Sequence, residues 1–467
     1  MSENNTYNIN REEMLELCET RRYTALMNCL DSLTPIDAAE FLSSLPQEKM
    51  PLIFRLLKKD LAAAIFAELD YDLQEQIILT LTDSEISDMV EELYTDDAVD
   101  MLEEMPANIV RRIMKNVTPA RRAEINRFLA YPENSAGSIM TSEFLDLKKE
   151  MTCAEAIKRI RQIGLDKETV YVAYVTGKSR ILEGVVALKS LLFAEPDTPI
   201  EEIMNPNVIF AYTHDDRETV ANMISRYDII ALPITDKERR LVGIVTVDDA
   251  LDVLKTEATE DIEKMAAILP TDKPYMKTGI WETWKKRVPW LLLLMLTATF
   301  TSTIITKYEA AIGTYAILTA FVPMLMNTGG NAGGQSSVTI IRGLSLGEIE
   351  MRDVFRVLWK EFAVSILCGI TLAAATFLKV MAIDFLFQAE TVLENGMVQN
   401  NLYIALVISI TVFFGIVIAK IVGTLLPIGT KRIGLDPAVM ASPFITTIVD
   451  TVTLVIYFTV ATLVLHI

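Results

Sequence analysis

The stretch Val288–Thr306, VPWLLLLMLTATFTSTIIT, runs for 19 residues without a charged side chain. An α-helix needs about 20 mostly apolar residues to cross the hydrocarbon core of a bilayer, so this stretch is predicted to span a membrane. Comparable stretches follow at about residues 310–327, 362–378, 402–427, which contains Lys420, and 438–466. The sequence therefore predicts five transmembrane helices in a lipid bilayer.

Charge is divided unevenly along the 467-residue chain. Residues 1–280 contain 51 Asp and Glu against 31 Lys and Arg, whereas residues 281–467 contain 11 against 12. The acidic first part is predicted to lie in water and the remainder in the bilayer. No basic surface is available to neutralise phosphates, so a nucleic-acid-binding protein is excluded. The scattered cysteines and histidines offer no zinc-ligand spacing and no catalytic pair, so no enzymatic activity is predicted.

Basic residues between the spans indicate how the chain is oriented. Lys and Arg gather before the first span, between the second and third spans, and between the fourth and fifth spans. By the positive-inside rule these segments are cytoplasmic. The N-terminal part is therefore predicted to be cytoplasmic and the C-terminus to lie outside. No apolar run opens the N-terminus, so no cleavable signal peptide is expected.

Residues 10–130 contain an internal repeat. The sequence DAAEFLSSLP at Asp37–Pro46 recurs as DAVDMLEEMP at Asp97–Pro106, offset by 60 residues. An Asp that can cap a helix, an apolar stripe and a closing Pro predict one short helix in each copy, and stacked copies predict an all-α superhelical domain. Such a domain either binds a ligand or braces its neighbours.

From Gly137 to Leu254 the pattern changes to short strands that alternate with helices in two similar units. The β runs are VYVAYV at 170–175 with LEGVV at 182–186, and IIALPI at 229–234 with LVGIV at 241–245. This duplicated pattern resembles a tandem pair of CBS modules, which fold as α+β units.

In CBS modules the pattern Gly-x-x-Thr-x-x-Asp can hold a ribose. Gly243, Thr246 and Asp249 fit it, whereas the first unit lacks both the hydroxyl and the carboxylate. One interpretation is a single regulatory nucleotide site, with ATP as the candidate ligand. The other is a strand followed by a helix cap, with no ligand.

The segment from Asp248 to Leu269 is predicted to be an acidic helix that leads into the first span. It carries seven carboxylates against two lysines, and further acidic groups surround Asp97 and Asp216. These patches are either solvated faces or sites that collect divalent cations. In the second case bound cations would draw the domains together, and their loss would let mutual repulsion push the domains apart.

Asp450 lies in the middle of the last span, with no Lys or Arg in that helix to pair with. Burying such a carboxylate costs about 3 kcal/mol, so it is predicted to face an aqueous path or a cation, the alternative being a protonated Asp at a helix contact. Ser442, Thr446 and Asp450 are spaced to share one helix face. Pro443 in the same span is expected to free the backbone carbonyl of Val439, which can serve as an oxygen ligand.

The segment Asn327–Ser336, NTGGNAGGQS, follows the second span. Its glycines predict non-helical backbone, which is tolerated at membrane depth only where it is buried in protein or lines a water-filled cavity. The segment is therefore expected to flank an ion pathway, the alternative being a flexible cytoplasmic turn. A phosphate-binding loop is not expected because no Gly-Lys-Ser/Thr follows.

Together, Asn327–Gln335, the GLDPA sequence at 434–438 and the pattern from Ser442 to Asp450 resemble the MgtE family of magnesium channels. The order of regions matches over almost the whole chain. The predicted fold class is a multidomain membrane protein. It has an all-α superhelical N-domain at 1–133, an α+β tandem CBS pair at 134–254, an acidic connecting (plug) helix at 255–280 and a five-helix α-helical transmembrane domain at 281–467.

The resemblance implies a homodimer in the bacterial cytoplasmic (inner) membrane that imports Mg²⁺ and closes when intracellular Mg²⁺ is plentiful. By position, Asp450 matches the family's ion-binding pore carboxylate. Asn327, Ser442 and Thr446 match positions where backbone carbonyls help to hold the hydrated ion, although the family's frequent Asn is absent at Ser442. The sensing carboxylates would be Asp97, Asp100, Asp216, Asp228, Asp249, Asp252, Glu257, Glu260 and Asp261.

The chemistry of the ion agrees with this assignment. Mg²⁺ gives up its water reluctantly, so two Asp450 side chains across a dimer axis would offer a ring wide enough for the hydrated ion. Two alternatives stay open: a nucleotide-regulated carrier for another divalent metal, Co²⁺ or Mn²⁺, and a membrane-anchored Mg²⁺ sensor that moves no ion. The intramembrane Asp argues against the sensor.

Overall fold

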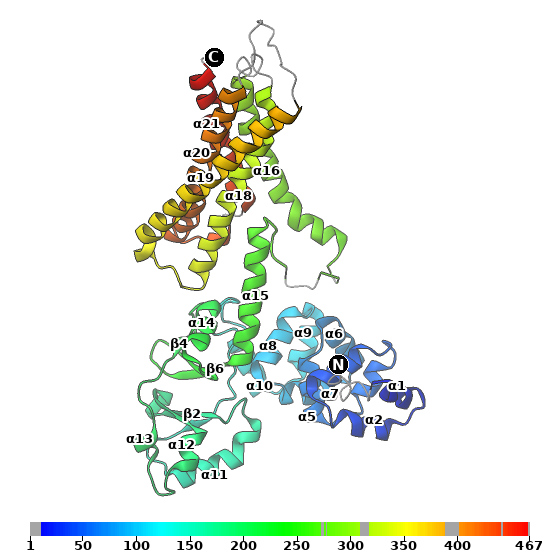
Figure 1. The fold of residues 1–467 in the computed structure, drawn as a ribbon. Helices are drawn as coiled ribbons and strands as arrows, with labels where there is room; N and C mark the ends of the chain where they lie inside the picture. Colours follow the sequence, from blue (N-terminus) through cyan, green and yellow to red (C-terminus); the bar gives the residue numbers. More distant parts are fainter. Residues whose placement is uncertain are drawn as a thin grey trace. The chain divides into compact units, whose positions relative to one another are not determined.

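The computed structural model describes residues 11–271, 275–276, 278–308, 317–387, 401–439 and 442–465. The chain divides into two compact units, Met1–Leu254 and Lys255–Ile467 (Figure 1). The first unit contains the helical repeats and the two α+β modules, and the second contains the long apolar helices.

The first unit opens with a series of short helices. They are α1 (Arg11–Glu19), α2 (Tyr23–Leu30), α3 (Pro35–Ser43), α4 (Met50–Phe54), α5 (Lys59–Ala67), α6 (Tyr71–Thr80), α7 (Asp83–Glu92), α8 (Thr95–Glu104), α9 (Ala107–Asn116) and α10 (Pro119–Phe128). The repeated sequence forms α3 and α8, as expected. The capping prediction was wrong, because Asp37 lies in the first turn of α3 and the side chain of Thr34 accepts the N-cap hydrogen bond.

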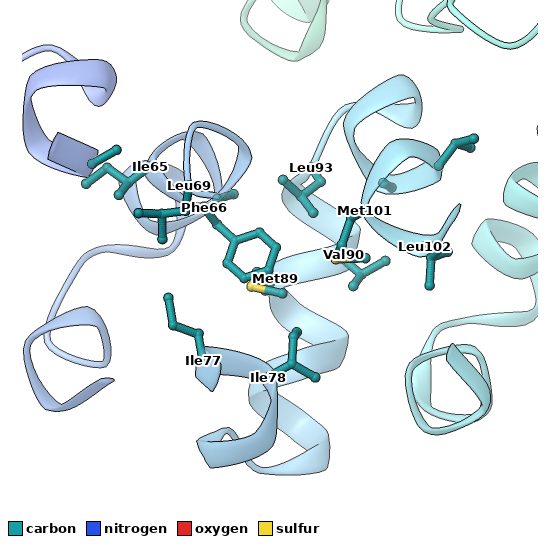
Figure 2. Close-up of a cluster of buried hydrophobic side chains, with 14 of the residues drawn as sticks. Ile65, Phe66, Leu69, Ile77, Ile78, Met89, Val90, Leu93, Met101 and Leu102 are labelled. Carbon is teal, nitrogen blue, oxygen red and sulfur yellow. The ribbon is translucent and has the colours of Figure 1, made fainter. Parts of the chain in front are cut away.

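Apolar side chains from successive helices meet in one core. Figure 2 shows Phe66 of α5, Ile77 and Ile78 of α6 and Met89 of α7 converging with side chains of α8. Full burial of such a side chain contributes about 1.5–3 kcal/mol, which compensates for the low intrinsic stability of helices this short. The core thus fixes the position of α8 and of the acidic residues that it carries.

Two three-stranded sheets follow, one in each α+β module. The first module contains β1 (Asp146–Leu147), α11 (Cys153–Ile163), η1 (Gly164–Asp166), β2 (Val172–Thr176), η2 (Lys178–Arg180), β3 (Leu182–Ala187) and α12 (Leu188–Phe193). The second contains α13 (Ile200–Ile203), β4 (Ala211–Tyr212), α14 (Arg217–Tyr227), β5 (Ala231–Thr235), β6 (Leu241–Thr246) and the start of α15 (Val247–Met265).

The two sheets have the same topology. In each, the first strand runs parallel to the second, and the second pairs antiparallel with the third. Both also contain a register shift near the end of the central strand, at Val175/Thr176 and at Ile234/Thr235. This shared irregularity confirms the duplication expected from the sequence.

The second unit is built from long helices. They are α16 (Ile280–Lys307), α18 (Ile317–Ser345), α19 (Val354–Phe387, preceded by η3, Met351–Asp353), α20 (Asn401–Arg432) and α21 (Ser442–Leu465, preceded by η4, Pro437–Val439). Helix α20 packs against α18, α19 and α21 (Figure 1). Within the described residues, α16, α19, α20 and α21 are long and apolar enough to cross a membrane, whereas α18 does not meet this criterion. The count of five spans stays a prediction.

Helix α18 runs without interruption through the glycine-rich segment, so the expectation of non-helical backbone at 327–336 was wrong. The glycines allow close helix packing instead. A Cβ atom on Gly330 would lie 2.6 Å from Cγ2 of Thr446, and one on Gly423 would lie 2.2 Å from the carbonyl oxygen of Gly333. Small residues at such positions let helix backbones approach closely in a membrane.

Pro443 does not interrupt a helix, contrary to the expectation that it would free the carbonyl of Val439 within the last span. Helix α21 begins at Ser442, so Pro443 lies in its first turn, where the missing N–H is not needed by the helix.

Candidate ion pathway and cation-sensing site

Asp450 lies in the second turn after Pro443 on α21 and is half-buried. Its Oδ1 atom is buried and has no hydrogen-bond partner among the described residues. A buried carboxylate oxygen without a partner is costly, and water or a cation would remove this cost. Thr446, on the same helix face, contacts α18 at Gly330. The side chain of Ser442 lies outside the described residues.

A polar stripe lies on α18. Asn327, Asn331, Gln335 and Thr339 are spaced by four residues, and all are exposed. Nδ2 of Asn331 donates to Oδ1 of Asn327 at 3.2 Å. Amide side chains on a membrane helix need hydrogen-bond partners. Water or another polar side chain can provide them, whereas lipid cannot. The sequence reasoning singled out only Asn327, although the spacing of four would have identified the others.

A group of carboxylates surrounds the start of α15 in the first unit. Asp97 comes from α8, Glu168 from the segment between η1 and β2, and Asp249 from α15. Burial, followed by the negative charge of Asp249, raises the pKa of Asp97 to about 7. Burial also raises the pKa of Glu168 to about 8 and that of Asp249 to about 6. These side chains repel one another.

Glu168 carries the clearest sign of a missing partner in this group. Its Oε2 atom is buried and unpaired within the part of the chain that the structure describes. The sequence reasoning missed Glu168, because a lone Glu in a loop carries no pattern that places it beside α15. Burial raises the pKa of the adjacent Asp96 well above its ordinary value, and Asp97 and Asp249 raise it further.

The other carboxylates predicted from the sequence lie in different surroundings. Asp100 and Asp252 are exposed but remain close enough to interact with the group. Burial and the charge of Asp97 raise the pKa of Asp100 to about 7, and the charge of Asp252 contributes to the raised pKa of Asp249. Asp216 caps the start of α14, where it accepts from the backbone N–H of Thr219, and Asp228 ends the same helix in a left-handed conformation. Among the described residues, no three His, Cys, Asp or Glu side chains are arranged so that they could hold a metal ion. The predicted sensing set is therefore not assembled as a coordination shell in this structure.

The second half of α15 belongs to the second unit and carries Glu257, Glu260 and Asp261. Nζ of Lys264 lies 2.5 Å from Oε1 of Glu260 and 2.6 Å from Oδ2 of Asp436. Oδ2 of Asp261 accepts from the hydroxyl of Ser345 at 3.1 Å. Part of the acidic charge of this helix is thus already compensated by groups of the second unit. The helix ends at Met265, before the predicted Leu269.

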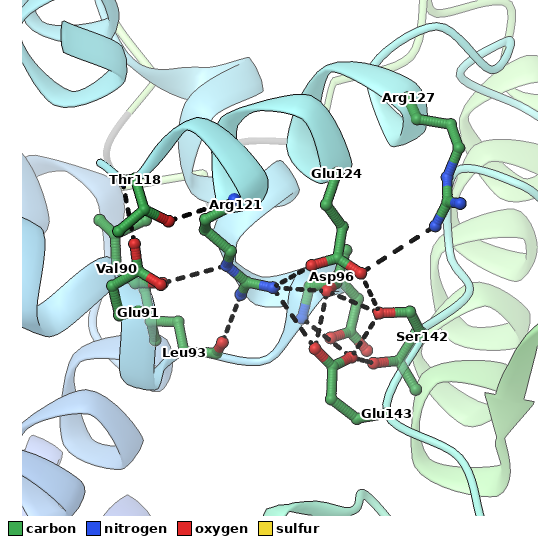
Figure 3. A network of polar contacts seen from close by, with 12 residues as sticks. Val90, Glu91, Leu93, Asp96, Thr118, Arg121, Glu124, Arg127, Ser142 and Glu143 are labelled. Carbon is green, nitrogen blue, oxygen red and sulfur yellow. Dashed lines mark hydrogen bonds and ion pairs between the residues drawn. The ribbon is translucent and has the colours of Figure 1, made fainter. Parts of the chain in front are cut away.

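Arg121 holds the start of α8 in place (Figure 3). Its Nη1 lies 2.8 Å from the hydroxyl of Thr95 and 3.4 Å from Oε1 of Glu143, and Nη2 donates to the carbonyl of Leu93. Burial alone would raise the pKa of Glu143, but hydrogen bonds from Thr141 and Thr95 and the charge of Arg121 lower it. Glu143 is therefore a fixed negative charge beside the raised-pKa carboxylates.

Thr246 ends β6, and its hydroxyl donates to Oδ2 of Asp249 at 2.5 Å. The two residues of the proposed ribose motif are thus in contact. This hydrogen bond also fits a helix cap without ligand.

Comparison of the chain with known proteins identifies its family. The family model for MgtE, described as a divalent cation transporter, matches residues 322–460, the MgtE intracellular N domain matches 33–134, and a CBS domain matches 200–256. The chain is 36% identical to the magnesium transporter MgtE of Thermus thermophilus, over 98% of both chains. The chain belongs to the MgtE family.

The likeness to MgtE proteins extends to other relatives. The magnesium transporter MgtE of Bacillus subtilis is 28% identical over the full length of both chains. A crystal structure of the soluble part of a magnesium transporter matches with a TM-score of 0.52 and 30% identity, covering 54% of this chain and 99% of that one. The resemblance drawn from the motifs is confirmed. Membership of a transporter family also confirms the prediction that the chain is not an enzyme.

Proposed function

We propose that the chain is a channel that imports Mg²⁺ across the bacterial cytoplasmic membrane, with its N-terminus in the cytoplasm and its C-terminus outside. The observation that carries the proposal is the buried, unpaired Oδ1 of Asp450 inside an apolar helix. A hydrated dication passing this atom would satisfy it without a protein partner. The names of the full-length relatives support Mg²⁺ as the ion.

The pathway is proposed to lie between α18 and α21. Asp450 would attract the hydrated ion, while backbone carbonyls at Asn327, Ser442 and Thr446 would accept hydrogen bonds from its waters. The exposed amides of Asn331 and Gln335 would continue the polar lining along α18. A second copy of the chain would close the pathway and shield this stripe from lipid, so the channel is proposed to be a homodimer.

Closure is proposed to follow Mg²⁺ binding in the cytoplasm. The residues fit a cation, because the carboxylates around α15 repel one another and Oε2 of Glu168 is unpaired in the described structure. Mg²⁺ holds several waters and binds few carboxylates directly, so a loose acidic group suits it. Its ligands would come from Asp97, Asp100, Asp216, Asp228, Asp249, Asp252, Glu257, Glu260 and Asp261, together with Glu168.

ATP is proposed as a further regulator of the second CBS module. Asp249 would accept from the ribose hydroxyls and Thr246 would orient that carboxylate, since the two side chains are already hydrogen-bonded. Because Asp249 also belongs to the acidic group, a nucleotide and a cation bound there would affect each other.

Flux measurements in liposomes test the pore assignment. Asp450→Asn keeps the shape of the side chain but cannot carry its charge, so Mg²⁺ flux is expected to fall about tenfold or more while the protein still inserts. Thr459→Val on the same helix, exposed in the structure, is the matched control and should retain flux. Unchanged flux in the Asp450 variant would reject the pore assignment.

The same liposomes separate the rival functions. Preference for Co²⁺ or Mn²⁺ in competition with Mg²⁺ would favour a carrier for another metal. Absence of any flux from the unmodified protein would favour a membrane-anchored sensor.

A further inference from the structure

The second unit contains a charged network that the proposed ion pathway does not use. Lys420 of α20 is 6% exposed, and its Nζ lies 3.5 Å from Oε2 of Glu361 on α19. Ser336 of α18 joins the pair, since its hydroxyl donates to Oε2 of Glu361 at 2.7 Å and accepts from Nζ of Lys420 at 3.0 Å. One hydroxyl and two opposite charges thus connect three helices.

Stability alone does not account for such a network. A buried ion pair commonly contributes no more to stability than apolar side chains of the same size, because both charges lose their hydration. A better-supported role for buried polar groups is to favour one register of helix packing over the others. Charges within membrane helices also mark functional positions by default.

The register between α18 and α20 is a property that this network can select. Gly333 precedes Ser336 by one turn, and a Cβ on Gly333 would lie 3.1 Å from the carbonyl oxygen of Ala419, next to Lys420. At this contact the facing surfaces are glycine backbone, which offers few side chains to prevent sliding. A slip of one turn would move α18 by about 5.4 Å along its axis.

The position of α18 in turn sets the geometry next to Asp450. The same Cβ on Gly333 would lie 3.2 Å from Cγ2 of Val449, the residue before Asp450. Gly330, Gly333 and the exposed amides of Asn331 and Gln335 lie on one continuous helix. A shift of α18 would therefore change the height of these amides relative to the pore carboxylate.

We propose that Lys420 and Glu361 are positioning residues of the ion pathway, which act through Ser336 to hold α18 in register with α20 and α21. This inference rests on the proposed pore at Asp450. It assigns the network a role in how fast, and how selectively, divalent cations pass.

The test uses full-length protein in liposomes and the double variant Lys420→Met with Glu361→Gln, which removes both charges together and leaves neither unpaired. We expect it to insert and remain monodisperse, to pass Mg²⁺ about tenfold more slowly, and to discriminate less between Mg²⁺ and Ca²⁺. The single variant Lys420→Arg keeps the cation beside an unchanged Glu361. It should therefore retain most of the wild-type flux and discrimination. Lys379→Met, at an exposed lysine of α19, is the control for loss of a positive charge.

If the double variant does not insert, Ser336→Ala provides the second test, because it leaves the ion pair and removes only its link to α18. It is expected to lower the Mg²⁺ to Ca²⁺ flux ratio. Wild-type flux and discrimination in either variant would overturn the proposal. A lack of Mg²⁺ flux in the unmodified protein would instead reject the proposed function.

Discussion

Arg121 is a buried cation whose guanidinium joins α7, α8 and the start of the first CBS module through Val90, Thr95 and Glu143 (Figure 3). We expect Arg121→Met to destabilise the first unit by about 3–5 kcal/mol, because buried Glu143 would lose its cationic partner and the carbonyls of Val90 and Leu93 would lose the guanidinium donor. Chemical denaturation followed by proteolysis of the full-length protein measures this change.

Arg127→Met is the matched control for Arg121→Met. Arg127 lies on the same helix, half its side chain is exposed, and its contact to Glu124 is 4.0 Å long. Its loss should change stability by less than about 1 kcal/mol. Equal effects of the two substitutions would contradict the importance assigned to burial.

Individual residues differed in how well the sequence predicted them. Asp450 could be identified because a lone carboxylate in an apolar run is costly in any membrane helix. Glu168 could not, because its environment is created by segments far away in the chain. Asn331 and Gln335 were overlooked because their helical spacing was concealed by the expectation of irregular backbone around the glycines.

Among the elements, α18 shows packing overriding local propensity. Its glycines disfavour a helix in water, by about 1 kcal/mol each relative to Ala, yet they allow the close contact with α20 and α21 that keeps it helical. Gly423→Ala should therefore cost about 1–3 kcal/mol, since the new Cβ would lie 2.2 Å from the backbone of Gly333. A lower thermal midpoint in detergent and reduced Mg²⁺ flux are the expected results.

Gly429 on the same helix offers the control, because a Cβ there would meet no atom within 4 Å. Gly429→Ala should be neutral or slightly stabilising through its better helix propensity. A loss of stability at Gly429 as large as that at Gly423 would show that flexibility of α20, and not close packing, explains the glycines.

At the scale of the molecule, the order of regions could be predicted because each has its own periodicity and charge. The repeat predicted the helical domain, the duplicated strands predicted the two modules, and the apolar runs predicted the long helices. The number of spans stays open because one of these helices, α18, is not among the candidate spans and contains a segment made mostly of Gly, Asn, Gln and Ser. Its polar side chains are the ones assigned to the proposed pathway.

The acidic group of the first unit predicts how Mg²⁺ and pH act together. In the folded unit the pKa values are about 7 for Asp97, 8 for Glu168 and 6 for Asp249, whereas unfolded carboxyls titrate near about 4. Between these values the folded state binds more protons than the unfolded state, so without Mg²⁺ the stability should fall as pH rises from about 4 to about 8. Mg²⁺ needs the deprotonated carboxylates, so its stabilising effect should grow over the same interval.

Thiol labelling during heating can measure this effect, because Cys18 and Cys153 are buried in the first unit and become reactive when it unfolds. A background of Cys29→Ser with Cys368→Ser removes the half-buried thiol of the first unit and the half-buried thiol of the second unit. The increase in midpoint caused by Mg²⁺ is compared with that caused by NaCl of equal ionic strength, at pH 5.5 and at pH 8. We expect the Mg²⁺ increment to be larger at pH 8 and to shrink in Glu168→Gln. An increment that is equal at both pH values, or that NaCl reproduces, would mean that Mg²⁺ acts elsewhere or by screening alone.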